Sequence, residues 1–230
     1  MDSFYYNNQY IYVVNHGDFS LYYNNQNGKI ACAKSVELLE SDFFEIPIDT
    51  TINLEEVSYE QLYLVVSESC NFRCKYCRQR KTSSLENMSN DEIKSAIDIF
   101  YKVSKTPKSI VFFGGEPLLN FKGIRYAVNY VRSFDNMVSF SMVINGSLCT
   151  REVAAFLSKN KVEVIVSMDG PEIYHNMARC DAHGNGTYQK ALCSYKLLKD
   201  MGCRTGITSV IGPHNEEYFE ELVNWAIELK

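Results

Sequence analysis

The chain has 230 residues, of which 46% are hydrophobic, and it carries a formal net charge of −5 at pH 7. A chain of this length and composition can bury a substantial core, and its acidic balance argues against nucleic acid as the main partner. The sequence has neither an apolar stretch of about 18 residues nor a basic-then-apolar leader, so a membrane partner, a membrane span and Sec export are not expected.

The first part of the chain predicts a small unit of its own. Tyr10–Val14 and Phe19–Tyr23 alternate in polarity like two strands around a His-Gly-Asp turn, which is typical of a hairpin. Lys34–Ser41 is expected to form a short helix. We therefore divide the chain into a small α+β region, residues 1–55, and a larger domain, residues 56–230.

The larger domain alternates predicted strands with helical patterns. A capping box at Ser89 and Glu92 marks the start of one helix. Repeated strand–helix units predict an α/β fold whose right-handed crossovers make the strands parallel. The strand candidates, rich in Val, Ile and Phe as buried parallel strands are, are Leu62–Ser67, Ser109–Phe113, Val138–Ile144, Val162–Met168 and Gly206–Ile211.

Each predicted strand is followed by a segment of polar or glycine residues. In β/α barrels the active site lies at the C-terminal ends of the strands. We therefore expect these segments to meet at one edge of the sheet and to form the functional site there. They are the loop with Cys70, Cys74 and Cys77, then Gly114-Gly-Glu-Pro117, Asn145-Gly146, Ser167-Met-Asp-Gly170 and Gly212-Pro-His-Asn215.

The cysteines of the first loop are spaced C-x3-C-x2-C, with an aromatic residue before the last one. Three thiolates on one short loop can each bind one iron of a cubane cluster, and without a fourth cysteine nearby one iron stays open to another ligand. Open metal positions are typical of catalytic sites, whereas structural sites tend to be closed. The alternative is a zinc site completed by a distant His or Cys.

The cysteine loop and the segments after it resemble the radical S-adenosylmethionine (radical SAM) superfamily. The resemblance implies a partial (β/α) barrel with about five of the family's six units. It also implies a 4Fe–4S cluster on Cys70, Cys74 and Cys77, with S-adenosylmethionine bound at the open iron. In this family the reduced cluster splits the cofactor, and the resulting 5′-deoxyadenosyl radical takes a hydrogen atom from the substrate.

Gly-Gly-Glu-Pro resembles the family motif that binds the amino group of the cofactor's methionine. Glycines let the backbone approach a ligand closely, and the Glu116 carboxylate can hold an ammonium group. The stretch from Ser167 to Arg179 resembles one in the peptide-modifying branch, where the Ser contacts ribose or carboxylate and the Arg contacts the carboxylate. A planar guanidinium suits a carboxylate, and the alternative for Arg179 is a solvated surface charge.

Two further candidates are less specific. Asn145 fits either a ribose contact or a plain turn. Tyr76 fits the family position whose backbone meets the adenine, with a ring that only packs. The sequence identifies no catalytic acid or base. The full set of cofactor-binding candidates is Tyr76, Gly114, Gly115, Glu116, Pro117, Asn145, Ser167 and Arg179.

The remaining five cysteines show no paired C-x2-C spacing. An oxygen-sensitive cluster requires a reducing compartment, so the expected location is the cytoplasm, where disulfides are rare. We interpret these cysteines as buried or free thiols, because free cysteine packs as a small hydrophobe. They are Cys32, Cys149, Cys180, Cys193 and Cys203.

The favoured function is a radical SAM enzyme of the peptide- or protein-modifying branch. The layout of residues 1–55 resembles the leader-binding region of enzymes that modify ribosomal peptides, which makes this region a candidate for peptide binding. The expected partners are a precursor peptide or protein and an electron donor such as flavodoxin or ferredoxin. Two alternatives stay open: a sulfatase-type maturase that makes formylglycine, and a non-catalytic metal- or cluster-binding module.

The C-terminal part of the sequence leads us to expect a fragment. Five strand–helix units can be counted up to Lys230, whereas the family core has six. No cysteine-rich extension for auxiliary clusters follows, although in the maturases such clusters commonly lie beyond the barrel. The bond that is formed does not follow from the residues, because the cofactor makes the radical and the protein positions the reactants.

Overall fold

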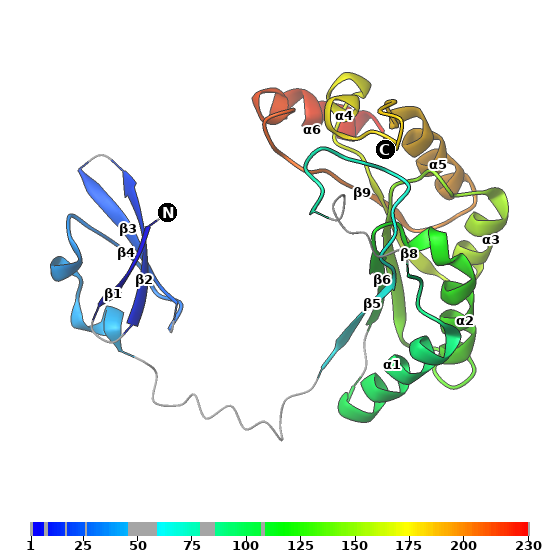
Figure 1. Cartoon of the computed structure of the whole chain (residues 1–230), viewed down its shortest axis with the longest axis horizontal. Helices are drawn as coiled ribbons and strands as arrows, with labels where there is room; N and C mark the ends of the chain where they lie inside the picture. Colours follow the sequence, from blue (N-terminus) through cyan, green and yellow to red (C-terminus); the bar gives the residue numbers. More distant parts are fainter. Residues whose placement is uncertain are drawn as a thin grey trace. The chain divides into compact units, whose positions relative to one another are not determined.

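The computed structural model describes residues 2–6, 9–16, 18–25, 27–45, 59–78, 86–106 and 109–229 (Figure 1). The chain divides into two compact units, Met1–Val57 and Ser58–Lys230. The predicted boundary between residues 55 and 56 and the turn residue Gly17 lie outside the described residues. Within the described part of the chain, no helix has the length and apolar character needed to cross a membrane.

The first unit is a four-stranded antiparallel sheet in the order β1-β2-β3-β4. Strands β2 and β3 pair as the predicted hairpin, with Val14 opposite Leu21. A small core forms around Ile11 and Tyr22. The strands are β1 (Asp2–Tyr6), β2 (Gln9–His16), β3 (Phe19–Asn24) and β4 (Ile30–Ala33).

The helix expected over Lys34–Ser41 is not formed. The chain instead makes two short 3-10 turns, η1 (Val36–Leu38) and η2 (Ser41–Phe44), joined by an extended Leu39 and Glu40. The physical reason is tertiary: Phe43 is buried in the small core, and its carbonyl accepts hydrogen bonds from the Asn24 and Asn27 side chains. These contacts bring the segment back onto the sheet, which a continuous helix would prevent.

The larger unit is a five-stranded sheet in the sequential order β5-β6-β7-β8-β9, and every neighbouring pair is parallel. The strands are β5 (Gln61–Ser67), β6 (Ser109–Gly114), β7 (Ser139–Ile144), β8 (Val162–Ser167) and β9 (Thr205–Thr208). The helices are α1 (Asn90–Val103), α2 (Phe121–Arg132), α3 (Arg151–Lys159), α4 (Glu172–Ala178), α5 (Tyr188–Asp200) and α6 (Phe219–Glu228), with 3-10 turns η4 (Pro117–Asn120) and η5 (Glu216–Tyr218).

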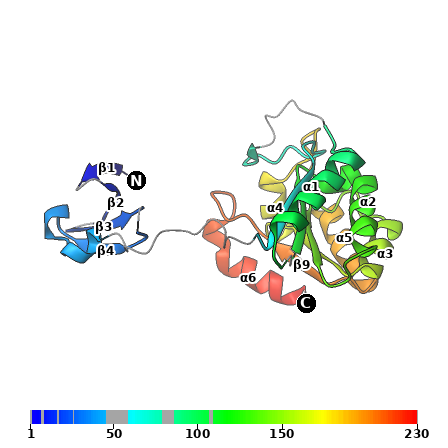
Figure 2. The ribbon, with the colours of Figure 1, turned by 90° about the horizontal axis from the view of Figure 1, so that it is seen from below.

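Helices α1, α2, α3 and α5 lie along one face of this sheet (Figures 1 and 2). Strand side chains on that face are fully buried, as at Phe112, Met142 and Val164. Side chains on the opposite face are open at the β5 and β6 end, where Tyr63 is 58% and Phe113 is 42% exposed. Consecutive parallel strands with helices on one face make a partial β/α barrel, which confirms the predicted α/β fold class.

The local signals for α1 act as the sequence predicts. The Ser89 hydroxyl accepts a hydrogen bond from the Glu92 backbone N–H at 3.3 Å, and the Glu92 carboxylate accepts one from the Ser89 N–H at 2.7 Å. This reciprocal capping box satisfies two backbone donors at the start of the helix. The helix then packs Ile93, Ile97 and Phe100 against the sheet.

The last strand is shorter than the predicted Gly206–Ile211, since β9 ends at Thr208. The backbone beyond it makes bonds to side chains instead of to a strand. The Val210 N–H donates to the Asp169 carboxylate at 2.9 Å, and the Val210 carbonyl accepts from the Asn215 amide at 2.9 Å. These contacts turn the chain away from the sheet and toward the ends of the other strands.

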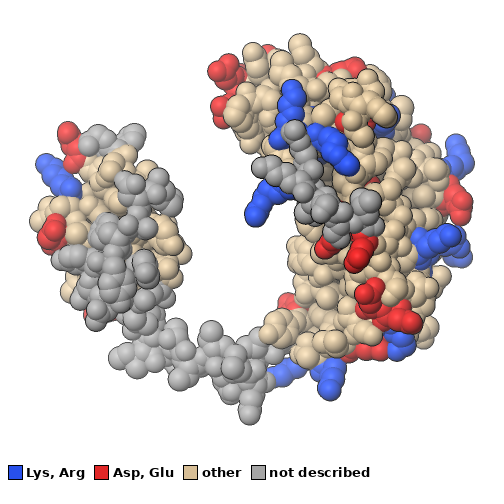
Figure 3. Space-filling view, viewed as in Figure 1, with Lys and Arg blue, Asp and Glu red and all other residues tan. Residues whose placement is uncertain are grey.

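Acidic and basic side chains are interspersed over the face of the larger unit that Figure 3 shows. Within α1, Lys94 and Asp98 form an ion pair at 2.6 Å. Among the described residues on this face, the charges do not form a long basic stripe of the kind that follows a phosphate backbone.

Candidate active site

One cavity lies at the C-terminal ends of the parallel strands and gathers the loops that follow β5, β6, β7 and β8. It contains every predicted site residue except Pro117, which begins η4 and is buried beside it. The cavity therefore unites residues that come from separate parts of the chain. Its lining residues are Cys70, Phe72, Cys74, Tyr76, Cys77, Phe113, Gly114, Gly115, Glu116, Val143, Ile144, Asn145, Ser167 and Arg179.

The cysteine loop is held in place by backbone hydrogen bonds to the last residue of α4 and to the segment after it. The Arg73 N–H donates to the Cys180 carbonyl and the Lys75 N–H donates to the Ala178 carbonyl, both at 2.8 Å. The Arg73 guanidinium also donates to the Cys70 carbonyl at 2.6 Å. The positions of the thiols are thus fixed by the main chain around them.

Burial disfavours the thiolate form of two of these cysteines, Cys70 and Cys74. It raises the pKa of the Cys70 thiol above its usual value and the pKa of Cys74 to about 11, and neighbouring thiolates add to both shifts. Arg179 opposes the shift at Cys74. Ionising these two thiols together needs a compensating positive centre, which a bound metal group supplies.

Three cysteines on one loop are a donor set that suits a cluster. Among the described residues, no group of three or more His, Cys, Asp and Glu side chains is arranged to hold a single metal ion. A cubane cluster makes a different demand, because each cysteine binds its own iron. Cys70, Cys74 and Cys77 meet that demand by lining one cavity.

Gly114 and Gly115 are required by the protein's own packing. A Cβ on Gly114 would lie 2.0 Å from the Ser67 carbonyl oxygen, and one on Gly115 would lie 2.2 Å from the Ser69 carbonyl oxygen. The Gly115 N–H donates to Ser67 O at 2.9 Å, and the Glu116 N–H donates to Ser69 O at 2.8 Å. The two glycines therefore join their loop to the backbone that leads into the cysteines.

Glu116 is 1% exposed and faces the cavity without a cation beside it among the described residues. Its carboxylate accepts the backbone N–H groups of Asn145 at 2.7 Å and Leu118 at 3.1 Å. Burial raises the pKa of this carboxyl group to about 7, although both hydrogen bonds favour the charged form. A cationic group placed in the cavity would stabilise the carboxylate.

Asn145 makes the turn and also links two parts of the site. Its side-chain oxygen accepts the Ser147 N–H at 2.9 Å, which is an Asx turn. Its side-chain nitrogen donates to the Asn71 side chain at 2.9 Å and lies 4.0 Å from the Cys70 sulfur. With its backbone bond to Glu116, Asn145 connects the carboxylate to the cysteine loop.

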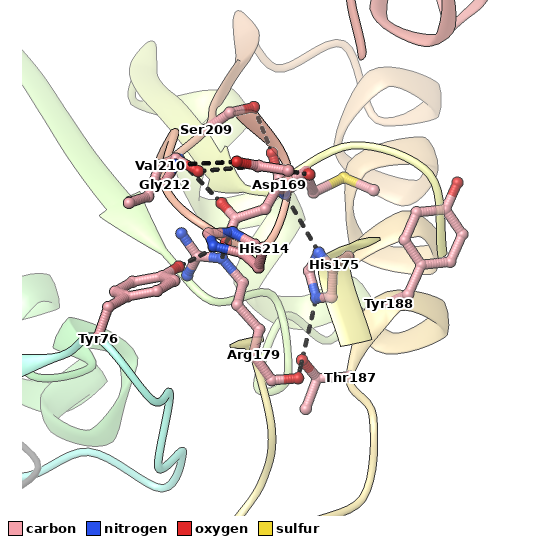
Figure 4. A network of polar contacts seen from close by, with 12 residues as sticks. Tyr76, Asp169, His175, Arg179, Thr187, Tyr188, Ser209, Val210, Gly212 and His214 are labelled. Atoms are coloured by element: carbon pink, nitrogen blue, oxygen red, sulfur yellow. Dashed lines mark hydrogen bonds and ion pairs between the residues drawn. The ribbon is translucent and has the colours of Figure 1, made fainter. Parts of the chain in front are cut away.

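Arg179 is buried, at 7% exposure, and is not a solvated surface charge. Its Nε lies 2.9 Å from Asp169 Oδ2, with the N–H poorly directed at that oxygen, so the contact is an ion pair (Figure 4). Its Nη atoms have no hydrogen-bond acceptor among the described residues. Ser167, 9% exposed on the same wall, also has its hydroxyl free of described partners.

The sequence did not single out Asp169 or His214, which complete this corner of the site. The Tyr76 hydroxyl donates to Asp169 at 2.6 Å, and the Tyr76 ring stacks on the His214 ring with centroids 5.5 Å apart. Both residues lie in segments that follow predicted strands, so their location at the strand ends could be predicted. Their contacts could not be predicted, because they join loops that are distant in sequence.

The other five cysteines are all free. Cys203 is buried, as expected for a packed thiol, and Cys149 and Cys180 are partly buried. Cys32 and Cys193 are exposed, so packing does not account for them.

Residues 64–226 match the model of the Radical SAM superfamily, and the chain belongs to this superfamily. The match confirms the predicted family and, with it, the cofactors that characterise the superfamily, a 4Fe–4S cluster and S-adenosylmethionine.

The chain is similar to a curated radical SAM cyclopropyl synthase and to curated anaerobic sulfatase-maturating enzymes. The radical SAM cyclopropyl synthase TigE of Paramaledivibacter caminithermalis is 29% identical in an alignment of 184 positions that covers 72% of this chain and 38% of TigE. A serine-type anaerobic sulfatase-maturating enzyme of Bacteroides thetaiotaomicron is 29% identical in an alignment of 178 positions that covers 71% of this chain and 42% of the enzyme. The chain thus spans less than half the length of either relative.

Solved structures share the fold. Native anSMEcpe with bound AdoMet matches with a TM-score of 0.68 and 26% identity, covering 73% of this chain and 48% of that one. Streptococcus suis SuiB bound to its precursor peptide SuiA matches with a TM-score of 0.59 and 17% identity, covering 75% and 37%, and shows the fold alone.

We expect Gly115→Ala to lower the free energy of unfolding by about 1–3 kcal/mol, because the new Cβ would meet backbone that must shift. Gly206→Ala is the control, since its Cβ would meet only Ile165 Cγ1 at 4.0 Å. Urea denaturation of both variants checks this. Equal stability of the two would contradict the close backbone contact.

We expect the buried Glu116 carboxyl to make the cofactor-free protein less stable as the pH rises from about 4.5 to about 7. The unfolded chain releases this proton near 4.5 and the folded chain near 7, so folding is penalised increasingly across that window, by up to roughly 3 kcal/mol. The stability of Glu116→Gln relative to wild type should therefore rise with pH. A difference that stays constant from pH 5 to 7.5 would refute the raised pKa.

Proposed function

We propose that this chain is the core of a radical SAM enzyme that modifies a peptide or protein. The observation that carries the proposal is the single cavity in which three cysteines meet Glu116, Ser167 and Arg179. The thiols suit a cluster, the buried carboxylate suits an ammonium group, and the guanidinium suits a carboxylate. Ammonium and carboxylate are the two charged groups of an amino-acid moiety such as that of S-adenosylmethionine.

Cys70, Cys74 and Cys77 would hold the cluster, and each would supply one thiolate. A bound, reduced 4Fe–4S cluster supplies the electron that cleaves S-adenosylmethionine and yields the 5′-deoxyadenosyl radical. The protein's own contribution is to fix the thiols through the backbone bonds of the loop, such as that from Arg73 to the Cys180 carbonyl. It also buries the site, which strengthens each electrostatic contact within it.

We propose that each of the remaining cavity residues binds or orients a different part of the cofactor. Glu116 would hold the ammonium group, and Arg179 would hold the carboxylate with its free Nη atoms. The free Ser167 hydroxyl lies on the same wall and would donate to the carboxylate or to ribose. Asn145 would act mainly by orienting Glu116 and the cysteine loop, since its polar atoms already have protein partners. Tyr76 would border the adenine by its backbone.

The comparisons support a peptide or protein as the substrate. One similar structure is that of native anSMEcpe with bound AdoMet and the Cp18Cys peptide, at 27% identity and a TM-score of 0.67. In this chain the sheet face opposite α1, α2, α3 and α5 exposes Tyr63, Val65 and Phe113, and Phe113 also lines the cavity. A substrate side chain lying on this face would reach the cofactor.

The electron donor would be a small redox protein such as flavodoxin or ferredoxin, and the protein would work in the cytoplasm.

A sulfatase-type maturase is the second candidate, because sulfatase-maturating enzymes are among the similar proteins. Anaerobic incubation with a sulfatase-derived peptide distinguishes the two candidates, since a product with formylglycine has a defined mass.

For the first unit, we propose that residues 1–55 bind a segment of the substrate that is not itself modified. A groove there runs beside the edge strand β4, between the exposed Ile30 and Leu38.

Cys74→Ala should abolish reductive cleavage of S-adenosylmethionine, because it removes a cluster ligand. Cys193→Ala should leave cleavage intact, because this cysteine is exposed on α5 and does not line the cavity. The measurements are iron content after anaerobic reconstitution and 5′-deoxyadenosine formed with dithionite. Equal loss in two folded variants, or zinc without iron in the wild type, would overturn the proposed function.

Glu116→Gln and Arg179→Ala should each weaken cofactor binding by about tenfold to a hundredfold, the worth of one charge-assisted hydrogen bond. The absorbance of the cluster should stay unchanged, because neither residue binds iron. Cofactor titration of the reconstituted protein measures this. The control is Arg125→Ala, which removes an exposed arginine paired with Glu152. Unchanged affinity in either site variant would remove that residue from the cofactor contacts.

A further inference from the structure

We propose that Asp169 is a positioning residue that orients Arg179, and with it Tyr76, toward the cofactor. The inference rests on the proposed function, since it concerns the same cavity. Asp169 does not line the cavity itself. It would act by holding the residues that do.

Asp169 is fully buried and its carboxylate collects contacts from three separate segments (Figure 4). Oδ2 accepts the Tyr76 hydroxyl of the cysteine loop at 2.6 Å and lies 2.9 Å from Arg179 Nε. His214 Nε2 approaches the same oxygen at 3.5 Å. Oδ1 accepts the Val210 N–H at 2.9 Å. One carboxylate thereby joins the loop after β8 to the cysteine loop, to the segment after α4 and to the loop after β9.

The ion pair with Asp169 leaves the Nη atoms of Arg179 available for a ligand. Asp169 engages only Nε, whereas the Nη atoms have no acceptor among the described residues. The guanidinium also lies over the Tyr76 ring, with Cζ 5.5 Å from the ring centroid. An arginine has many rotamers, and fixing it before binding reduces the entropy cost of forming a bidentate contact. Asp169 and Tyr76 together restrict the guanidinium to one orientation at the cavity wall.

The backbone of Arg179 is fixed by a second set of bonds that begins at the same residue. The Asp169 N–H donates to His175 Nδ1 at 3.3 Å, His175 Nε2 lies 3.0 Å from the Thr187 hydroxyl, and that hydroxyl donates to the Arg179 carbonyl at 3.2 Å. Burial lowers the pKa of His175 to about 4, so the ring is neutral and can accept at Nδ1 while it donates at Nε2. This backbone relay does not use the Asp169 carboxylate.

Because the carboxylate contacts and the backbone relay are separate, a substitution at Asp169 can remove the first and keep the second. Asp169→Asn keeps the backbone relay and an oxygen for the Val210 N–H, but it removes the negative charge that faces Arg179. Asp135→Asn is the matched control. Asp135 likewise accepts a tyrosine hydroxyl, that of Tyr101 at 2.8 Å, and a backbone N–H, that of Met137 at 2.7 Å. It stands before β7, at the sheet edge opposite the cavity.

The experiment is cofactor titration of the anaerobically reconstituted full chain, with the cluster absorbance recorded for each variant. We expect Asp169→Asn to weaken affinity for S-adenosylmethionine about tenfold with an unchanged cluster spectrum. Asp135→Asn should leave affinity unchanged. Because Asp169 acts through Arg179, the double variant Asp169→Asn/Arg179→Ala should bind as weakly as Arg179→Ala alone.

Wild-type affinity in Asp169→Asn would overturn the inference, as would losses that add in the double variant. If Asp169→Asn does not fold, Tyr76→Phe takes its place, because it removes one donor to the same carboxylate. Its loss of affinity should be smaller and should likewise vanish in an Arg179→Ala background, and an additive loss would count against Asp169. A wild-type chain that forms no cluster and binds no cofactor would overturn the proposed function itself.

Discussion

The candidate site depends on a contact between two stretches of backbone. Gly114 and Gly115 pack directly on the carbonyls of Ser67 and Ser69, at a distance that no side chain could occupy. This contact joins the ends of β5 and β6, so the cysteine loop and the loop with Glu116 are built as one piece. Strand pairing alone would align the two strands but leave their loops free. The glycines convert a shared sheet edge into a defined cavity wall.

The charges of the site are arranged for a ligand rather than for the protein's own stability. Burial raises the pKa values of Glu116 and Cys74, and both groups resist ionising without an added positive centre. Among the described residues, Arg179 is paired through Nε alone, and its Nη atoms have no hydrogen-bond acceptor. A buried group in this condition destabilises the fold. That cost is offset when a cationic cluster and a ligand with one ammonium and one carboxylate enter, so the electrostatics match the cofactors of the superfamily.

Much of the site could be predicted from the sequence because its key groups are local. The cysteines lie within one loop, and Gly-Gly-Glu-Pro is contiguous, so their spacing is visible without a fold. The strands could also be predicted, since their buried side chains are aliphatic or aromatic. What escaped prediction is long-range: the pairing of Asp169 with Tyr76 and Arg179, and the end of β9, which those same contacts decide. The missing helix over Lys34–Ser41 has the same origin, because the burial of Phe43 outweighs a local pattern.

The two faces of the larger unit's sheet differ: one is buried under helices, and the other stays partly open. On one face the helices bury a continuous apolar core, which holds the strand ends at fixed spacing. On the other face Tyr63 and Phe113 meet edge to face, with centroids 6.1 Å apart, and stay open. Large apolar side chains that remain exposed beside a charged cavity cost free energy in water. The proposed substrate would offset this cost by covering them, and it would also remove water from the cavity mouth. A reactive radical is best formed in such a covered site, because exclusion of water limits side reactions.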